Sequence, residues 1–472
     1  MNKEQQNIAD VMFILEAVDR FYLMTPQEVI AHISQHSQDT FATLSLTKGG
    51  HLFCGREAYD RFNEIADRTI KPGSDEDKAY DRGSYVRALR SSFVETFVEG
   101  GTSISQSSVT KFVNQAKHLA TARLVEVTRH IPCIVFYDKE PAVFSVGPVK
   151  FRTREAFFAE SSQALSDFVN AEREAFANGS AKRRSDLSQE AAAAEADAFA
   201  ATVDRKIREF YGDYGWVGSV EVPKSHASVS KRRAERTIDA ALDVLRLFVP
   251  STPERLGRAT SPRAPYETHE LSSNAGGRFF ASMHQGGRGA SAGEHWYEEI
   301  QRHTPHLWKL FGDAIDPIRS DTKPDELNQR LLDALNWFGQ GIVEPNTAAA
   351  IIKYTAALER LTMTGHVAGI EDVVIRRVLF LNFQRTDKTP ADVESDIGDL
   401  YQTRSDLMHG SQSPYDPKLE RILRLAWQVS RCAILEAAQL FALLRAEGKA
   451  NRKALAAMYD RGRVKHDESA GA

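Results

Sequence analysis

The apolar positions in the second half of the chain recur at the spacing of amphipathic helices. Between residues 324 and 446 they fall every three or four residues, and short polar stretches separate one run from the next. The first three stripes are Leu327, Leu331, Leu335, Phe338 and Ile342; Ile351, Ile352, Thr355, Leu358 and Leu361; and Ile370, Val373, Val374, Val378 and Leu381. Short connections between helices of similar length predict an antiparallel helical bundle over residues 324–446.

The pattern in the first half is mixed. Residues 1–80 are predicted to be a helical segment, in which Thr25 and Pro26 begin a second helix. Residues 81–250 are predicted to be an α+β domain, with runs rich in Val, Ile and Phe between helical runs. The strands are expected at 131–136, 142–151 and 216–222. The helices are expected at 84–99, 154–211 and 230–248. We expect Gly147 and Pro148 to break the second strand, and the turn residues around Gly179 to interrupt the long helix.

Two stretches lack a clear period. Residues 251–323 carry prolines followed by glycines and are predicted to be an irregular, Gly-rich connector. Residues 447–472 form a polar, mostly basic tail, which we expect to be frayed and solvated, with electrostatic contact to RNA as the alternative. The expected fold class is therefore mainly α, with a C-terminal helical bundle preceded by an α+β region that holds a small sheet.

One basic residue interrupts the apolar stripe of the helix that begins after Thr389. The stripe runs through Val393, Ile397, Leu400, Leu407 and Met408. Arg404 lies between Leu400 and Leu407, at a position where the helical spacing predicts an apolar residue. Burying an unpaired guanidinium costs several kcal/mol, so Arg404 should have an anion nearby or face a polar cleft. Glu359, at the edge of an apolar stripe, is the preferred counter-ion; an exposed pair of Glu359 with Arg360 or Lys353 is the alternative.

A histidine follows on the same helix. His409 comes five residues after Arg404, which is a rotation of about 140° and a rise of about 7.5 Å, and Gly410 can end the helix in a left-handed cap. The two side chains line one groove only if a second surface closes over them. A permanent cation beside a group that titrates near neutrality suits phosphate chemistry. A salt-bridged structural arginine and a histidine that caps carbonyls are the alternative.

Composition narrows the classes of function. The 472 residues are 42% hydrophobic and 26% charged, and the net charge of -4 excludes a basic nucleic-acid coat, so any RNA contact must be local. Three distant cysteines argue against a disulfide framework and fit a reducing compartment. No apolar run is long enough to span a bilayer, and no signal-peptide pattern opens the chain. We expect a cytoplasmic protein that does not bind membranes.

Two other patterns could carry chemistry. His295, Glu299 and His303 recur every four residues and could bind a metal from one helical face, although no fourth ligand is evident. The string G-G-R-G-A-S-A-G at 286–293 could suggest a phosphate loop or a nucleotidyltransferase, but it lacks the Gly-Lys-Ser/Thr ending and paired carboxylates. Surface side chains and a crossing loop are the simpler interpretations.

The motif L-Y-Q-T-R-S-D-L-M-H-G in a helical frame resembles the HEPN superfamily, which is marked by an arginine, four to six residues and a histidine. With A-L-N-W-F and A-A-L-E-R-L upstream, it is most similar to the ApeA-type branch, whose members are ribonucleases of bacterial antiphage defence and abortive infection. The resemblance covers residues 324–446. It is weaker at H-I-P-C-I-V-F and F-S-V-G-P-V-K-F in the N-terminal half.

The resemblance implies a HEPN-like bundle that cleaves RNA, with tRNA among the candidate substrates, without a metal or another cofactor at a homodimer interface. Arg404 and His409 would be catalytic, and Glu359, Ser405 and Asp406 would orient them. Many members have Asn, Asp or His directly after the arginine, whereas this chain has Ser405. The N-terminal α+β region is expected either to hold the dimer inactive or to sense a phage-derived trigger. The alternative is an inactive HEPN module that dimerises, binds RNA or regulates another protein.

Overall fold

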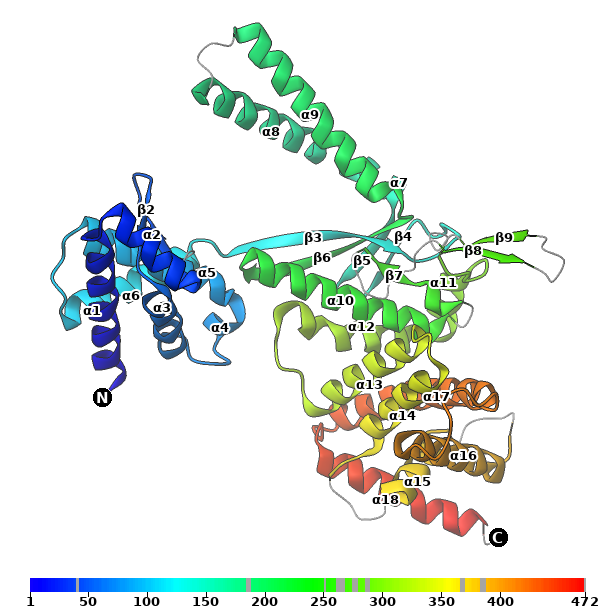
Figure 1. Ribbon diagram of the computed structural model, residues 1–472. Coiled ribbons are helices and arrows are strands. Elements are labelled where there is room, and N and C mark those ends of the chain that lie inside the picture. Colours follow the sequence, from blue (N-terminus) through cyan, green and yellow to red (C-terminus); the bar gives the residue numbers. More distant parts are fainter. Residues whose placement is uncertain are drawn as a thin grey trace. The chain divides into compact units, whose positions relative to one another are not determined.

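The computed structural model describes residues 1–39, 42–183, 188–249, 252–259, 268–273, 279–284, 289–365, 370–382 and 388–470. The fold is mainly helical, with small antiparallel sheets before a helical C-terminal region, and this confirms the predicted fold class (Figure 1). The chain divides into two compact units. The first comprises Met1–Val127 and Val222–Arg233, and the second comprises Thr128–Glu221 and Ala234–Ala472.

The first unit is helical apart from one small hairpin. Its elements are α1 (Lys3–Tyr22), α2 (Pro26–Gln35), a 3-10 turn (Ser37–Asp39), β1 (Thr43–Ser45), β2 (His51–Phe53), α3 (Arg56–Thr69), α4 (Asp75–Ala79), α5 (Arg82–Phe93), a π-helical turn (Val94–Glu99) and α6 (Gln106–Thr121). The predicted start of α2 at Pro26 is confirmed, with Thr25 as its N-cap. The β1–β2 hairpin and α4 were not predicted, because strands of three residues and a single helical turn show no period.

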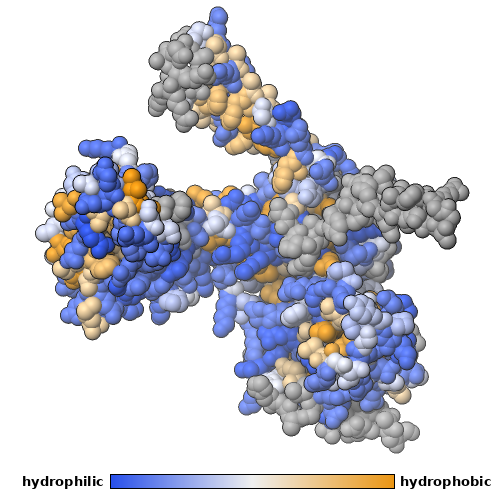
Figure 2. All heavy atoms as spheres, viewed as in Figure 1, coloured by the Kyte–Doolittle hydropathy of each residue, from blue (hydrophilic) through white to orange (hydrophobic). Residues whose placement is uncertain are grey.

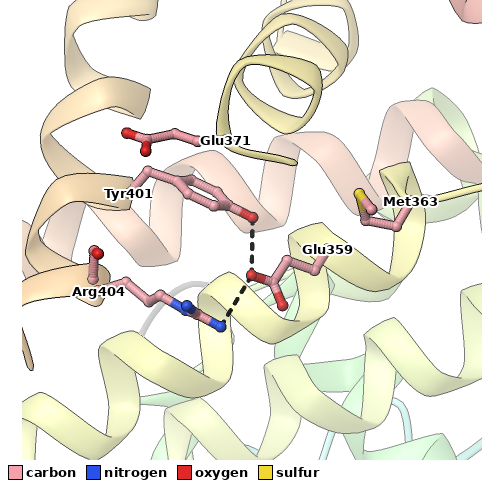
Figure 3. Close-up of a pocket in the computed structure, with 6 residues that line it drawn as sticks. Glu359, Met363, Glu371, Tyr401 and Arg404 are labelled. Atoms are coloured by element: carbon pink, nitrogen blue, oxygen red, sulfur yellow. Dashed lines mark hydrogen bonds and ion pairs between the residues drawn. The ribbon is translucent and has the colours of Figure 1, made fainter. Parts of the chain in front are cut away.

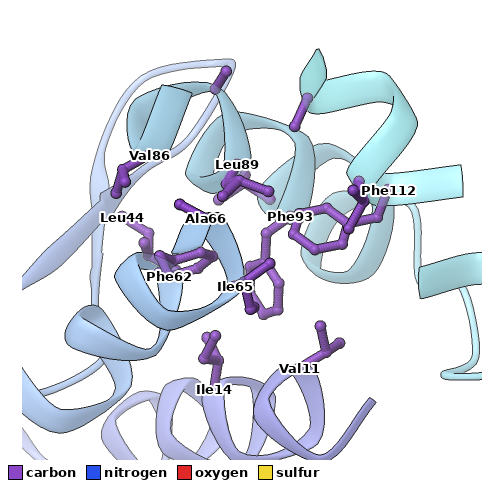
Figure 4. Close-up of a cluster of buried hydrophobic side chains, with 14 of the residues drawn as sticks. Val11, Ile14, Leu44, Phe62, Ile65, Ala66, Val86, Leu89, Phe93 and Phe112 are labelled. Carbon is purple, nitrogen blue, oxygen red and sulfur yellow. The ribbon is translucent and has the colours of Figure 1, made fainter. Parts of the chain in front are cut away.

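One hydrophobic core holds this unit together (Figure 4). Aromatic rings from three helices meet in it: the centroid of Phe93 on α5 lies 5.4 Å from that of Phe62 on α3 and 6.3 Å from that of Phe112 on α6. Val11 and Ile14 of α1 are fully buried in the same core. Residues on both sides of position 80 therefore share one core, and the boundary expected there does not separate two domains.

The main sheet lies mostly in the second unit, and two of its strands begin or end in residues assigned to the first. Its strands are β3 (Val125–Ile134), β4 (Val143–Val146), β5 (Val149–Thr153), β6 (Trp216–Ser225) and β7 (Gly257–Arg258), in the order β4-β5-β6-β3-β7. The predicted break at Gly147 and Pro148 is confirmed, because β4 and β5 form an antiparallel hairpin there, in which Val146 pairs with Val149. A second hairpin, β8 (Thr268–Ser273) with β9 (Phe279–His284), lies in the stretch that we predicted to be irregular. That prediction was wrong, because the surrounding glycines obscured two short strands.

The long helical run after the sheet contains α7 (Arg154–Glu160), α8 (Ser162–Arg183) and α9 (Gln189–Gly212). The predicted interruption at Gly179 was wrong, because α8 continues through that residue to Arg183. A glycine inside a helix costs roughly 1 kcal/mol relative to alanine. Packing against α9, through the stacked rings of Phe176 and Phe199 and the ion pair of Arg173 with Asp197, offsets this cost.

Three helices connect the sheet to the C-terminal bundle: α10 (Ala227–Phe248), α11 (Trp296–His303) and α12 (Pro305–Ser320). The indole of Trp308 on α12 donates a hydrogen bond to the Ser145 carbonyl of β4, at 3.0 Å. A Cβ at Gly312 would lie only 2.9 Å from the Gly147 backbone, so α12 can lie against the β4–β5 turn because residue 312 is a glycine.

The C-terminal bundle follows the predicted order. Its helices are α13 (Glu326–Ile342), α14 (Thr347–Thr362), α15 (Ile370–Asn382), α16 (Pro390–His409), α17 (Leu419–Ala446) and α18 (Arg452–Ala470). The long α17 runs through the bundle, with Val429, Ala433 and Ile434 fully buried.

The expectation of a frayed tail was wrong for its first part. Residues 452–461 lie in α18, where Leu455 and Tyr459 are buried, and the Tyr459 hydroxyl donates to the Leu361 carbonyl at 3.3 Å. The two residues are four apart and share one helical face, which packs against the bundle, where the rings of Tyr459 and Phe380 have centroids 5.8 Å apart.

Hydrophilic residues dominate the visible surface of both units, and hydrophobic residues appear there in small patches (Figure 2). Within the described residues, no helix is long and apolar enough to cross a membrane.

Candidate functional site

Helix α16 carries the two residues that the sequence singled out. Thr389 caps its N-terminus together with Asp392, and Pro390 occupies the first turn, as predicted. Val393, Ile397 and Leu400 are buried in the bundle. These contacts fix the first three turns of the helix and so determine where its C-terminal part lies.

The apolar stripe does not continue into the last turns. Leu407 is half-buried and Met408 is 55% exposed, so the last two residues of the stripe are not in the core. Burial along α16 continues as far as Thr403, residues 404–407 are half-buried, and Met408 and His409 are exposed. The C-terminal segment from Arg404 to His409 is therefore at the surface, where it is available to another molecule.

Arg404 is held by the counter-ion that the sequence favoured. Its Nη2 atom lies 3.3 Å from Oε1 of Glu359, near the end of α14, and the two side chains are 33% and 29% exposed (Figure 3). The alternative pairing of Glu359 does not occur, because Arg360 pairs with Asp333 and Lys353 pairs with Glu344. The guanidinium is thus neither free in solvent nor fully buried.

Tyr401, one turn before Arg404, completes the contact. Its hydroxyl donates a hydrogen bond to the same Oε1 atom of Glu359, at 3.2 Å. Burial raises the pKa of the Tyr401 phenol, and the negative charge of Glu359 raises it further. The phenol therefore stays protonated and acts as a donor across the working pH range. Sequence analysis did not single out Tyr401, although its spacing of three from Arg404 places both residues on one helical face.

A pocket of about 340 Å³ opens beside this contact. The lining residues come from α14, the residue that follows it, α15 and α16; they are Glu359, Met363, Glu371, Tyr401, Arg404 and Ser405. Glu371, in the first turn of α15, and Met363 were also not predicted, because their stretches of sequence show nothing that connects them to Arg404. Only the packing of α15 and α16 against α14 brings them together.

The other predicted supporting residues differ in their positions. Ser405 lines the pocket, whereas Asp406 does not. The Asp406 carboxylate accepts a hydrogen bond from Gln402, at 3.0 Å, and its carbonyl accepts from the Ser411 amide, at 2.8 Å. Asp406 therefore helps to end the helix, where Gly410 adopts the predicted left-handed cap with a φ of 74°.

His409 lies outside the pocket. Its side chain is exposed, and within the described part of the chain it has no hydrogen-bond or ion-pair partner. The single chain therefore does not place Arg404 and His409 in one closed crevice. Both are at the surface of the same helix end, so a shared cleft would require a second surface.

The residues proposed as a metal site are not arranged as one. His295 precedes α11 in a left-handed conformation, with a φ of 61°, and pairs with Glu298, while His303 is exposed at the other end of that helix. Among the described residues, no group of three His, Cys, Asp or Glu side chains is placed to hold a metal ion. Part of the Gly-rich string, residues 286–288, lies outside the described residues.

Arg404, Glu359 and Tyr401 thus form a fixed cation at a pocket, with an exposed imidazole about one and a half helical turns away. Comparison with protein-family models, with curated proteins and with solved structures gave no match.

Proposed function

We propose that this protein is a metal-independent endoribonuclease of the HEPN type that acts as a homodimer. The observation that carries the proposal is the placement of Arg404 and His409 at one exposed helix end, with Arg404 oriented by Glu359 on the wall of a pocket. The similarity of L-Y-Q-T-R-S-D-L-M-H-G to the HEPN motif supports the same reaction.

RNA supplies its own nucleophile, the 2′-hydroxyl, so the protein must supply a base, an acid and a cation. The His409 imidazole takes the proton of the 2′-hydroxyl, and the 2′-oxygen then bonds to the adjacent phosphorus. The bond from phosphorus to the 5′-oxygen breaks, and the partner subunit's His409 gives its proton to that oxygen. Arg404 stabilises the charge that develops on the phosphate oxygens. The products are a 2′,3′-cyclic phosphate and a 5′-hydroxyl.

The exposure of the helix end supports a dimeric site. One chain presents His409 without a partner and the apolar Met408 beside it, 55% exposed. Burying this surface against a second copy would remove Met408 from water and bring two imidazoles to one cleft. The resemblance further suggests a role in antiphage defence by abortive infection, in the bacterial cytoplasm.

The test is cleavage of a labelled single-stranded RNA by the purified protein in the presence of EDTA. We expect cyclic-phosphate and 5′-hydroxyl ends. Arg404→Ala and His409→Ala should each lower the rate by at least a hundredfold, on the order of what loss of an acid–base group costs. His306→Ala, which removes another exposed histidine, is the matched control. Cleavage that persists in His409→Ala, or that stops in EDTA, would contradict the proposal.

One observation favours the non-catalytic alternative. Arg404 already has a carboxylate partner, as a purely structural arginine would. In that case the bundle would dimerise, bind RNA or regulate another protein without cutting RNA. Expression in bacteria separates the two functions, because a nuclease should slow growth in a way that His409→Ala abolishes, whereas a scaffold should tolerate the change.

A further inference from the structure

The pocket beside Arg404 carries more negative than positive charge. Two of its lining residues are glutamates, Glu359 and Glu371, and Arg404 is the one cation among them. With both carboxylates ionised, the pocket carries a net charge of -1. A phosphate placed inside it would meet two like charges at close range, which is unfavourable in a partly buried site.

The phosphate of an RNA substrate should therefore lie outside the pocket. Arg404 has five N–H donors in a planar fork, and its closest contact to Glu359 is through Nη2, at 3.3 Å. The rest of the fork can bind a phosphate on the solvent side of Arg404, toward the helix end that carries His409. The pocket interior is then left for another part of the nucleotide.

The groups that remain in the pocket are hydrogen-bond acceptors. The Oε1 atom of Glu359 accepts a hydrogen bond from Tyr401 and is its closest atom to Arg404, whereas no hydrogen bond reaches its Oε2 atom from the described residues. The Glu371 carboxylate likewise has none, and in Figure 3 no dashed line reaches it from the other residues drawn. The Tyr401 hydroxyl, which could have been a donor to a ligand, is already used. The pocket thus favours a ligand that presents N–H donors.

Building on the proposed ribonuclease activity, we infer that this pocket binds the base next to the cleaved phosphate and selects guanine. Guanine alone among the four RNA bases presents two adjacent donors, N1–H and the N2 amino group, which match the two oxygens of one carboxylate. Adenine, cytosine and uracil each place an acceptor beside a donor on that edge, and this acceptor would face a carboxylate oxygen. Single-stranded RNA exposes this edge.

The remaining walls suit a flat aromatic ligand. The Met363 thioether is polarizable and adapts to an aromatic ring, and Tyr401 offers its own ring beside Glu359 (Figure 3). Glu371 is the residue that we assign to base recognition, because its carboxylate is not needed to hold Arg404. Specificity and catalysis therefore depend on different glutamates, and mutation can separate them.

The experiment uses the full-length protein and short single-stranded RNAs that differ only in the base 5′ to one cleavable phosphate: guanosine, inosine or adenosine. We expect cleavage after guanosine to exceed cleavage after adenosine on the order of ten- to a hundredfold, the usual discrimination of a bidentate base contact, with inosine between them. A second set of RNAs carries the same bases 3′ to the phosphate. Comparing the two sets shows whether the pocket binds the base on the 5′ side or the 3′ side of the cleaved phosphate. Glu371→Gln should lower the ratio of cleavage after guanosine to cleavage after adenosine to about one, because it removes the carboxylate that accepts both guanine donors. Glu394→Gln, an exposed glutamate of α16, is the control.

A binding measurement keeps this inference separate from the proposed function. Calorimetry measures the affinity of the wild type and of Glu371→Gln for guanosine and for adenosine. This measurement does not depend on RNA cleavage. Selective guanosine binding that Glu371→Gln abolishes would support the pocket even if no RNA is cut, and the nuclease proposal would then fail alone. Cleavage without a base preference at either position, or equal binding of the two nucleosides, would overturn the inference.

Discussion

A single carboxylate oxygen has two partners in this structure, one through a hydrogen bond and one through an ion pair. The Tyr401 hydroxyl and the Arg404 guanidinium both meet Oε1 of Glu359, at 3.2 Å and 3.3 Å. Each donor restricts the rotation of Glu359, and Glu359 in turn restricts Arg404. A cation fixed before the substrate arrives stabilises a transition state better than one that must reorganise. At the scale of the residue, Tyr401 is thus a positioning residue that would act through Glu359.

We expect Tyr401→Phe to weaken both stability and activity. The substitution keeps the buried ring and removes one hydrogen bond, so the free energy of unfolding should fall by about 1 kcal/mol. Because Arg404 becomes less restrained, the cleavage rate at saturating RNA should fall several-fold, while the KM changes little. Urea denaturation and steady-state kinetics measure the two effects. Tyr415→Phe, at a tyrosine that is 89% exposed, should change neither. A lower stability with an unchanged rate would assign Tyr401 to structure alone.

At the scale of the element, the site depends on how α14 ends. Arg330 donates to the carbonyls of Arg360 and Met363, and Arg377 donates to that of Thr362, at 2.6 Å. The Tyr459 hydroxyl donates to Leu361. Side chains from α13, α15 and α18 therefore satisfy the carbonyls that the end of α14 leaves open, and positive charge there is favourable. The last turn of α14, which carries Glu359, is held from three directions.

The start of α13 offers a test with a defined pH dependence. Asp325 caps this helix by accepting from the Asn328 amide, at 2.8 Å, and it pairs with Arg445 of α17. Burial raises the pKa of the Asp325 carboxyl, but the hydrogen bonds from Arg445 and from backbone amides outweigh this effect and keep the pKa below its usual value.

Because its pKa is lowered in the folded protein, the ionised Asp325 stabilises the fold at pH values above its unfolded pKa of about 3.9. This stabilisation is lost as the pH falls through the folded pKa. Asp325→Ala should cost about 1 kcal/mol at pH 7, the usual cost of losing an N-cap, and the difference from the wild type should shrink below pH 4. Urea denaturation across pH 3–7 measures it. Asp313→Ala, which breaks an exposed pair with Lys309, should cost less than about 0.5 kcal/mol at pH 7. A cost for Asp325→Ala that is the same at pH 3 and pH 7 would contradict this account.

At the scale of the whole molecule, the candidate site lies entirely in the second unit, at the end of the C-terminal bundle. The first unit has its own core, which contains none of the site residues. One chain supplies one Arg404 and one His409, whereas the proposed reaction needs an acid and a base. The oligomeric state should therefore control activity.

We expect the specific activity to fall when the protein is diluted below the dissociation constant of its dimer. Met408→Glu places a charge beside His409 and should shift the equilibrium to monomers and abolish cleavage, with little effect on the stability of the chain. Sedimentation velocity and RNA cleavage on the same samples measure both. Met12→Glu, at a methionine that is 46% exposed in the first unit, should leave the dimer intact. An active monomer would refute the dimeric site.

Much of the fold could be predicted from local pattern. The helices of the bundle, the start of α16 at Pro390 and its cap at Gly410 follow from apolar spacing and capping residues, which act over a few positions. Features that depend on a few residues were missed, such as the β1–β2 hairpin and the docking of α18 through Leu455 and Tyr459. Gly179 was misjudged because contact with another helix outweighed its local preference.

The sequence alone determined that Arg404 needed an anion, since it stands on an apolar stripe, and it suggested Glu359 as the partner. Only the tertiary structure placed Tyr401, Met363 and Glu371 around the same pocket and left His409 exposed. The physical reason is the range of the interactions. Helix periods and caps are determined by residues that are close together in the sequence. A pocket forms where separate helices pack together, and the contacts of α14, α15 and α16 depend on the packing of the whole bundle.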